Sequence, residues 1–257
     1  MFTKKINKKE TTISVDLDEP LTSNSCSKLI IESMKYILYQ KQQIPFPYDT
    51  LLQLQKTNKP TNKNNNTIKN LLATIELITD ELTCQLHTNE CDVREVIIVI
   101  GATPVSPKFL VKFELPDNIL SSKKHMEYQH SYRKPLLTLM RCLIKSDEFQ
   151  DAMALPQGPT NTFVLVQKSD ASTKSDFFLP KPQYTPPIQT STCISIKIKH
   201  NDTINPNCTC MNIVKIHHDN DESSVDDIPI NIIQICTKKP YLWYQSKEVV
   251  KGFKYIG

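Results

Sequence analysis

Apolar side chains recur at spacings of three and four after residue 25, which predicts an amphipathic helix with a single apolar face. Ser25 can cap the start of this helix, because its hydroxyl can accept a hydrogen bond from an orphan amide of the first turn. Pro45 and Pro47 end it, since each lacks an amide donor and disfavours helical geometry in the residue before it. The apolar stripe consists of Leu29, Ile30, Ile31, Met34, Ile37 and Leu38.

Two further helices are predicted, at about 67–86 and about 130–146. Thr67 can cap the former, and Pro135 is tolerable only near the start of the latter. Leu137 widens the apolar stripe of 130–146 well beyond the ~100° that a surface helix needs, so both the protein's own sheet and something else are expected to pack on it. The rest of that stripe is Leu136, Leu139, Met140, Leu143 and Ile144.

Short β-branched or alternating runs predict the strands. They lie at 93–100, 106–116, 162–166, 193–199, 212–217 and 229–237. Three early helices, strands between them and a late run of strands favour an α+β fold, because the βαβ alternation of a wound parallel sheet is missing.

The chain is predicted to form one domain over residues 23–257, preceded by a disordered, basic and polar tail at 1–22. Three polar or proline-rich stretches are predicted to be long loops within that domain. They cover residues 55–67, 168–192 and 200–228, the last of which includes an acidic run at 217–227.

Composition then narrows the function classes. The net charge is +4 with mixed signs, so a nucleic-acid partner has little support. No run approaches the ~18 apolar residues of a membrane span, and the basic start has no apolar stretch behind it, so a soluble intracellular protein with reduced thiols is expected. The whole chain has 4 glycines, which argues against a phosphate-cradling loop and a nucleotide-binding enzyme.

One cluster could carry metal chemistry. Cys208 and Cys210 precede the pair His217 and His218, and thiolate and imidazole are zinc ligands. The single residue between the cysteines is a narrower gap than usual, and no second cysteine pair follows. A polar hairpin loop is the favoured interpretation, and a small metal-dependent enzyme or hydrolase is the alternative. We therefore expect no catalytic residues, no bound metal and no cofactor.

Four segments, in the same order along the chain, resemble the comet family, whose members are adaptors that bind the mitotic-arrest-deficient-two checkpoint protein. The most similar is 36–51, YILYQKQQIPFPYDTL, with a basic residue, a Gln-Gln pair and a Pro-x-Pro-Tyr run. The others are 98–108 (IVIGATPVSPK), 177–184 (FFLPKPQY) and 241–254 (YLWYQSKEVVKGFK).

The resemblance implies a HORMA-like fold, in which three helices pack on a mostly antiparallel sheet. It also implies that the carboxy-terminal segment occupies the protein's own safety-belt groove, which would bury Trp243 and Phe253 by self-docking. From the residues alone, an ordinary final strand explains the aromatic terminus equally well.

The resemblance further implies two partner surfaces. Gln40, which follows a tyrosine on the first helix, matches one of the family's checkpoint-protein contacts. On the third helix Met140 stands where the family has an aromatic contact residue, and it can equally be a core residue. Pro180 and Lys181 match the Pro-Lys pair that contacts an AAA+ remodelling ATPase. Leu179 stands where the family has arginine, which weakens the electrostatic part of that contact.

The implied function is a non-enzymatic adaptor. It would bind the closed checkpoint protein, present it to the ATPase, promote disassembly of the mitotic checkpoint complex and silence the spindle checkpoint. Such a protein is expected in nucleus and cytoplasm, and at spindle and kinetochores in mitosis. The alternative within this fold is a HORMA module that clasps a partner peptide.

Overall fold

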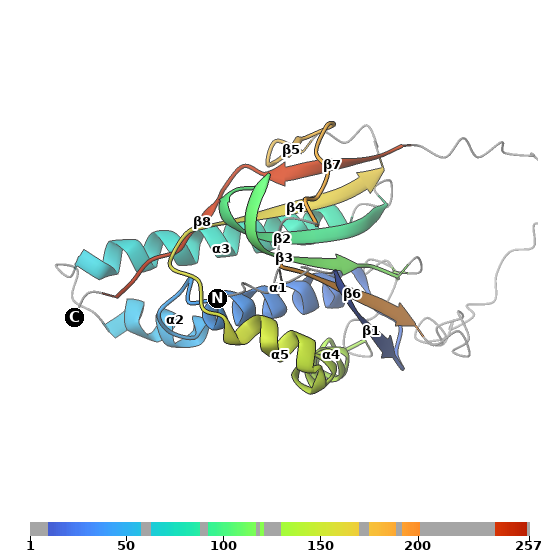
Figure 1. Cartoon of the computed structure of the whole chain (residues 1–257), viewed down its shortest axis with the longest axis horizontal. Coiled ribbons are helices and arrows are strands. Elements are labelled where there is room, and N and C mark those ends of the chain that lie inside the picture. Colours follow the sequence, from blue (N-terminus) through green and yellow to red (C-terminus); the bar gives the residue numbers. More distant parts are fainter. Residues whose placement is uncertain are drawn as a thin grey trace, which may run out of the picture.

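The computed structural model describes residues 10–57, 63–87, 92–116, 119–120, 130–169, 175–188, 192–200 and 240–255. Helices and strands are combined within these ranges, which confirms the α+β class (Figure 1). The helices are α1 (Ser23–Gln40), α2 (Tyr48–Thr57), α3 (Lys63–His87), α4 (Arg133–Lys145) and α5 (Asp147–Ala154). The strands are β1 (Thr11–Leu17), β2 (Val93–Thr103), β3 (Ser106–Glu114), β4 (Asn161–Ser169), β5 (Phe178–Pro180), β6 (Thr192–His200), β7 (Tyr241–Ser246) and β8 (Val250–Lys251).

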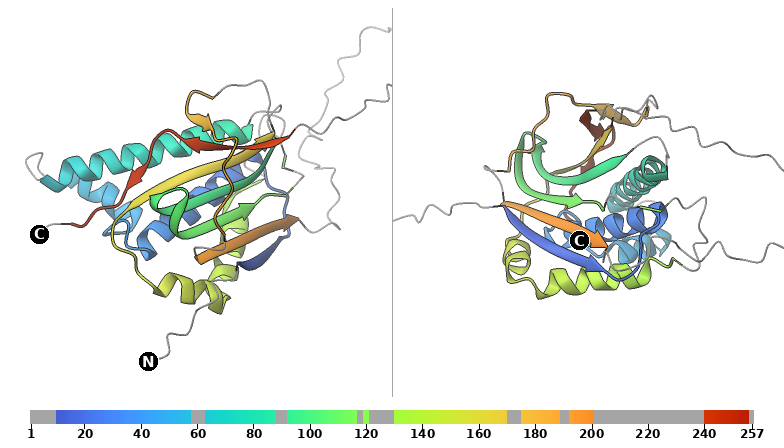
Figure 2. Two further views of the ribbon diagram at one scale, coloured as in Figure 1. Left: turned by 45° about the horizontal axis from the view of Figure 1, so that its top comes forward. Right: turned by 90° about the vertical axis from the view of Figure 1, so that its right-hand side faces the viewer.

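These strands form one mixed sheet with the order β1-β6-β3-β2-β4-β7-β5, and β8 extends the pairing along β4. β6 runs parallel to both of its neighbours, β1 and β3, and the remaining pairs are antiparallel. The carboxy-terminal strand β7 therefore lies between β4 and β5, far from the edge that β1 forms (Figure 2).

Both faces of the central strands are buried. The larger core cluster lies between the sheet and the helices, and it takes Ile98 and Val164 from β2 and β4. A smaller cluster on the opposite face takes the alternate residues Ile97 and Leu165, together with Trp243. Successive strand residues point to opposite faces, so these two clusters explain the nearly continuous apolar runs of β2 and β4.

The cap of α1 differs from the expectation. Thr22, not Ser25, is the N-cap, and its hydroxyl accepts a hydrogen bond from the Ser25 amide at 3.1 Å. The Ser25 hydroxyl in turn accepts from the Thr22 amide at 2.8 Å, so the two residues form a capping box. The helix begins at residue 23 because this reciprocal pair satisfies two orphan amides at once.

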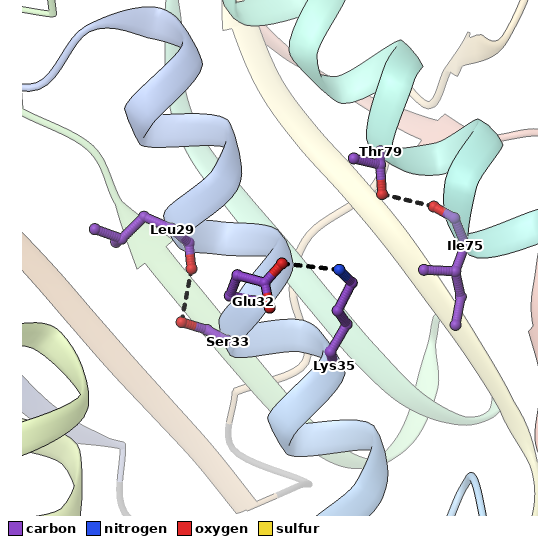
Figure 3. Close-up of polar contacts among 6 residues, drawn as sticks. All are labelled: Leu29, Glu32, Ser33, Lys35, Ile75 and Thr79. Carbon is purple, nitrogen blue, oxygen red and sulfur yellow. Dashed lines mark hydrogen bonds and ion pairs between the residues drawn. The ribbon is translucent and has the colours of Figure 1, made fainter. Parts of the chain in front are cut away.

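Polar side chains inside the helical layer are satisfied locally (Figure 3). Ser33 is fully buried in α1 and donates to the Leu29 carbonyl at 2.8 Å, while Thr79 in α3 donates to the carbonyl four residues earlier. Lys35 pairs with Glu32 at 2.8 Å and its ammonium lies 4.2 Å from the centroid of the Tyr48 ring, which ties the start of α2 to α1.

The prediction of three helices is wrong, because α2 and α5 are additional. α2 begins directly after Pro47, whose carbonyl accepts from the Leu51 amide, so this proline opens a helix. α1 has already ended at Gln40, before Pro45 and Pro47. α5 follows α4 after a single residue, Ser146, whose hydroxyl accepts from the Phe149 amide at 3.2 Å as an N-cap.

The prediction that residues 1–22 form a disordered tail is wrong for the second half of that range. Residues 11–17 form β1, in which Ile13, Val15 and Leu17 alternate toward the helices while the strand pairs with β6. This run is too short to stand out by period alone, and the parallel partner comes from the other end of the chain.

The predicted loops need partial correction. α2 and α3 extend into 55–67 from both sides, so Thr67 lies inside α3 and is not its cap. β4 and β5 occupy parts of 168–192. The predicted strands at 212–217 and 229–237 and the acidic run at 217–227 lie outside the described residues. No helix in the described part of the chain combines the length and apolar character needed to cross a membrane.

Candidate partner-binding surfaces

The carboxy-terminal end of α1 is built on an unusual backbone conformation. Gln42 has φ of 53°, and among the described residues it is the only non-glycine with positive φ. The Gln43 amide donates to the Leu38 carbonyl at 2.8 Å and the Gln42 amide to the Tyr39 carbonyl at 3.0 Å, which is the Schellman pattern. This turn leaves Gln40 half-buried at the end of the helix and sends the chain toward Pro45.

Gln43 is fully buried and joins three segments of the protein. Its side-chain carbonyl accepts from the Thr160 amide at 2.8 Å. Its amide nitrogen donates to the Lys41 carbonyl at 2.9 Å and lies 3.3 Å from the carbonyls of Gln157 and Gly158. Its backbone carbonyl accepts from the amide of Phe253 at 3.0 Å. The Gln-Gln pair of the sequence therefore has two structural roles, one in backbone geometry and one in hydrogen bonding.

Lys41 is also buried, with 1% of its surface exposed. Its ammonium donates to the carbonyls of Ala152 and Leu155, the latter at 3.0 Å, at the carboxy-terminal end of α5. It lies 4.3 Å from the centroid of the Phe109 ring. The negative end of a helix dipole and an aromatic face both favour a cation, but burial opposes it and lowers the pKa of Lys41 to about 8.

This lowered pKa predicts a pH dependence of folding. Because the folded protein releases the Lys41 proton near pH 8 and the unfolded chain near its ordinary 10.5, the unfolded state binds more protons in between. The free energy of unfolding of the wild type should therefore rise, relative to that of Lys41→Met, as the pH increases from about 8 to 10.5. Urea titrations of both proteins at several pH values measure this difference, and a constant difference across the window would contradict the assignment.

The carboxy-terminal segment docks on the body along its whole described length. β7 pairs with β4 and β5, and Trp243 is 7% exposed in the smaller core cluster. The Tyr184 ring meets the Trp243 ring edge-on at 5.8 Å, and burial raises the pKa of Tyr184 to about 12. The Lys181 amide donates to the Trp243 carbonyl at 2.7 Å, so the exposed Pro180–Lys181 turn is attached directly to β7.

The end of the segment is attached to the end of α1. The Gly252 amide donates to the Thr160 carbonyl at 2.8 Å. A Cβ atom on Gly252 would lie 2.7 Å from the Gln43 side-chain carbonyl and 2.9 Å from the Thr160 carbonyl, so this close approach requires glycine. Phe253 is half-buried and packs against the larger core. It also lines an open hollow of about 620 Å³ together with Gln40.

The third predicted helix, α4, divides its wide stripe between two environments. Leu139 and Leu143 are fully buried, and Met140 is partly buried and packs against the larger core cluster. Leu137 and Ile144 are 53% and 55% exposed, and they lie seven residues apart, which places them on one side of the helix. Leu137 and Ile144 therefore form the exposed apolar side of α4. The breadth of the apolar stripe in the sequence indicated such an exposed side of the helix.

Two pairs of the candidate residues meet in the structure. Gln40 and Phe253 line one hollow, and Lys181 is hydrogen-bonded to Trp243. Met140 lines neither place. Cys208, Cys210, His217 and His218 lie outside the described residues, within which no group of three or more metal-binding side chains occurs.

Comparison with known proteins places this architecture in a family. Residues 3–202 match the family model of p31comet, described as Mad1 and Cdc20-bound-Mad2 binding. The match covers most of the chain and includes α1, the α4–α5 pair and the Pro180–Lys181 turn. The chain belongs to the p31comet family.

Two curated relatives agree with this assignment. The MAD2L1-binding protein of Homo sapiens is 22% identical over 248 residues, which cover 91% of this chain and 77% of the relative. The MAD2L1-binding protein of Mus musculus is 22% identical over 246 residues, with 91% and 76% covered. The family description and both names refer to binding of a protein and to no reaction. The resemblance to the comet family is confirmed.

Proposed function

We propose that this p31comet-family protein is an adaptor for Mad2, the mitotic-arrest-deficient-two checkpoint protein. It binds the closed conformer of Mad2 and presents it to an AAA+ remodelling ATPase, so that the mitotic checkpoint complex disassembles and the spindle checkpoint is silenced. The observation that carries this proposal is the family match over residues 3–202, whose description names Cdc20-bound Mad2. The protein would act without catalysis of its own, in nucleus and cytoplasm and at spindle and kinetochores in mitosis.

The surface chemistry of the helices supports the Mad2 part of the proposal. The half-buried Gln40 and the exposed pair Leu137 and Ile144 lie on α1 and α4, the two helices on which the family resemblance locates the contact. Met140 packs against the larger core cluster, so it would support the contact indirectly by holding α4 in place. Exposed apolar side chains that lie together on one side of a helix can form the apolar centre of a protein-binding face.

The geometry of the Pro180–Lys181 turn supports the ATPase part. Both residues are exposed, and the Lys181 amide is held by the Trp243 carbonyl at 2.7 Å. A turn fixed in this way loses little conformational entropy when a partner binds it. Leu179, 45% exposed, precedes it in place of the family's arginine, so the contact would rely on Lys181 for its charge.

The docked carboxy-terminal segment supports the HORMA-like interpretation with a self-occupied safety belt. Residues 241–245 and 250–251 already pair with β4, where a clasped peptide would have to lie in the alternative function. Exchange of this segment for a peptide would cost the burial of Trp243, so the peptide-clasping alternative has less support.

Selectivity for one Mad2 conformer is the property to test, because a ligand that bound both conformers equally would shift neither population. The full chain is mixed with Mad2 locked closed, and separately with Mad2 locked open, and each mixture is analysed by size-exclusion chromatography. We expect a stable complex with the closed form alone. Gln40→Ala should weaken that complex about tenfold. Binding to neither form would refute the adaptor function, and equal binding to both would refute its selectivity.

A further inference from the structure

We propose that the carboxy-terminal end of the chain, residues 253–255, is itself part of the Mad2-binding surface. This inference rests on the proposed function, and it adds residues of a second segment to the contact made by Gln40. The geometry that carries it is the hollow of about 620 Å³ beside the end of α1. Residues from the end of α1 and the turn after it form one side of the hollow, and the docked carboxy-terminal end forms the other. The lining residues are Tyr39, Gln40, Gln42, Ile44, Pro45, Phe253, Lys254 and Tyr255.

The composition of this hollow is that of a protein-recognition surface. Tyr39 is 40% exposed, and Phe253 and Tyr255 are half-buried, so three aromatic rings are partly accessible within one small area. Aromatic residues are enriched in interfaces because they offer a large contact area with little side-chain entropy to lose. Gln40 contributes amide donors and acceptors beside them. The hollow is therefore suited to an inserted side chain of a protein partner.

The carboxy-terminal side of the hollow is held in place before any partner binds. The Phe253 amide donates to the Gln43 carbonyl, and the Gly252 amide donates to the Thr160 carbonyl. The Tyr255 ring meets the Phe46 ring edge-on at 5.4 Å, which fixes the last described residue against the turn after α1. Because Gln43 lies three residues after Gln40, the last residue of α1, the same Schellman turn positions both sides of the hollow.

The charge of the lining residues indicates which kind of Mad2 segment would fit the hollow. Lys254 is exposed, and among the described residues that line the hollow there is no carboxylate. An apolar or aromatic side chain of Mad2 would enter between the rings, with an acidic side chain beside it facing Lys254. Opposite charges across an interface favour association, and like charges oppose it strongly.

A charge reversal tests this directly in the full-length chain. The affinity for closed Mad2 is measured by titration calorimetry for the wild type, Lys254→Glu and Tyr255→Ala. Each variant is expected to bind about tenfold more weakly. Lys251→Glu is the matched control, since Lys251 is exposed on β8 in the same segment but does not line the hollow. It should bind within about twofold of the wild type.

The outcomes separate this inference from the proposed function. Amide hydrogen exchange at Phe253 reports whether each variant keeps the segment docked, and we expect full protection in Lys254→Glu. If Lys254→Glu and Tyr255→Ala bind like the wild type while Gln40→Ala weakens binding, the carboxy-terminal contact is refuted and the adaptor function stands. If the wild type itself fails to bind closed Mad2, both are refuted. If Lys251→Glu lost as much affinity for closed Mad2, the loss would reflect the net charge of the protein, and the specific contact would also be refuted.

Discussion

Replacement of Gln43 by alanine is expected to lower the free energy of unfolding by about 3 kcal/mol. The side chain is fully buried, and its removal leaves the Thr160 amide without its acceptor and three backbone carbonyls without their shared donor. Each buried polar group left unsatisfied costs about 1–3 kcal/mol. Because typical domains are stable by only about 5–15 kcal/mol, the loss should be large enough to move the denaturation midpoint clearly.

Gln53→Ala is the matched control for this prediction. Gln53 is exposed on α2, so the same change of side chain should alter stability by no more than about 0.5 kcal/mol. Urea denaturation of the wild type and the two variants gives the comparison. A loss below about 1 kcal/mol for Gln43→Ala would mean that water replaces the lost hydrogen bonds, and the junction of α1 with residues 157–160 would then be less important than proposed.

The apolar patterning of the sequence predicted the parts of the fold that depend on local period. The stripe from Leu29 to Leu38 is buried, and the runs at 93–100 and 193–199 are strands. The period failed where elements were short or joined closely, as in β1 and α5. α4 and α5 are separated by a single polar residue, Ser146, and β1 is a strand of only 7 residues, so the apolar period alone does not delimit either element.

Sequence patterns could not predict the polar junction around Lys41 and Gln43, for a physical reason. Its partners are carbonyls of residues 152–158, more than a hundred positions later, and the amide of Phe253. No spacing rule links side chains across such separations. The Gln-Gln pair and Gly252 lie in two of the segments that resemble the comet family, and the structure supplies a physical reason for each: a left-handed residue at 42, a buried amide at 43 and a close backbone approach at 252.

The largest loss of binding is expected from the double variant Leu137→Glu with Ile144→Glu on α4. Both side chains are more than half exposed, so the charges they gain remain in water and the fold should be retained. If these residues anchor the contact with closed Mad2, each replacement removes an apolar contact worth about 1.4 kcal/mol and places a charge in the interface. Together they should weaken binding about 100-fold, measured by titration calorimetry.

Leu137 and Ile144 are replaced because they are exposed, whereas Met140 on the same helix packs against the larger core cluster. A glutamate at Met140 would lie against the core, so its effect on binding could not be separated from a loss of folding. Leu77→Glu on α3 is the matched control, because Leu77 is 42% exposed on a different helix and the change of side chain is the same. It should leave the affinity unchanged. If the α4 variant bound closed Mad2 as tightly as this control, α4 would contribute only to the core, and the contact would be confined to the end of α1 and the segment docked beside it.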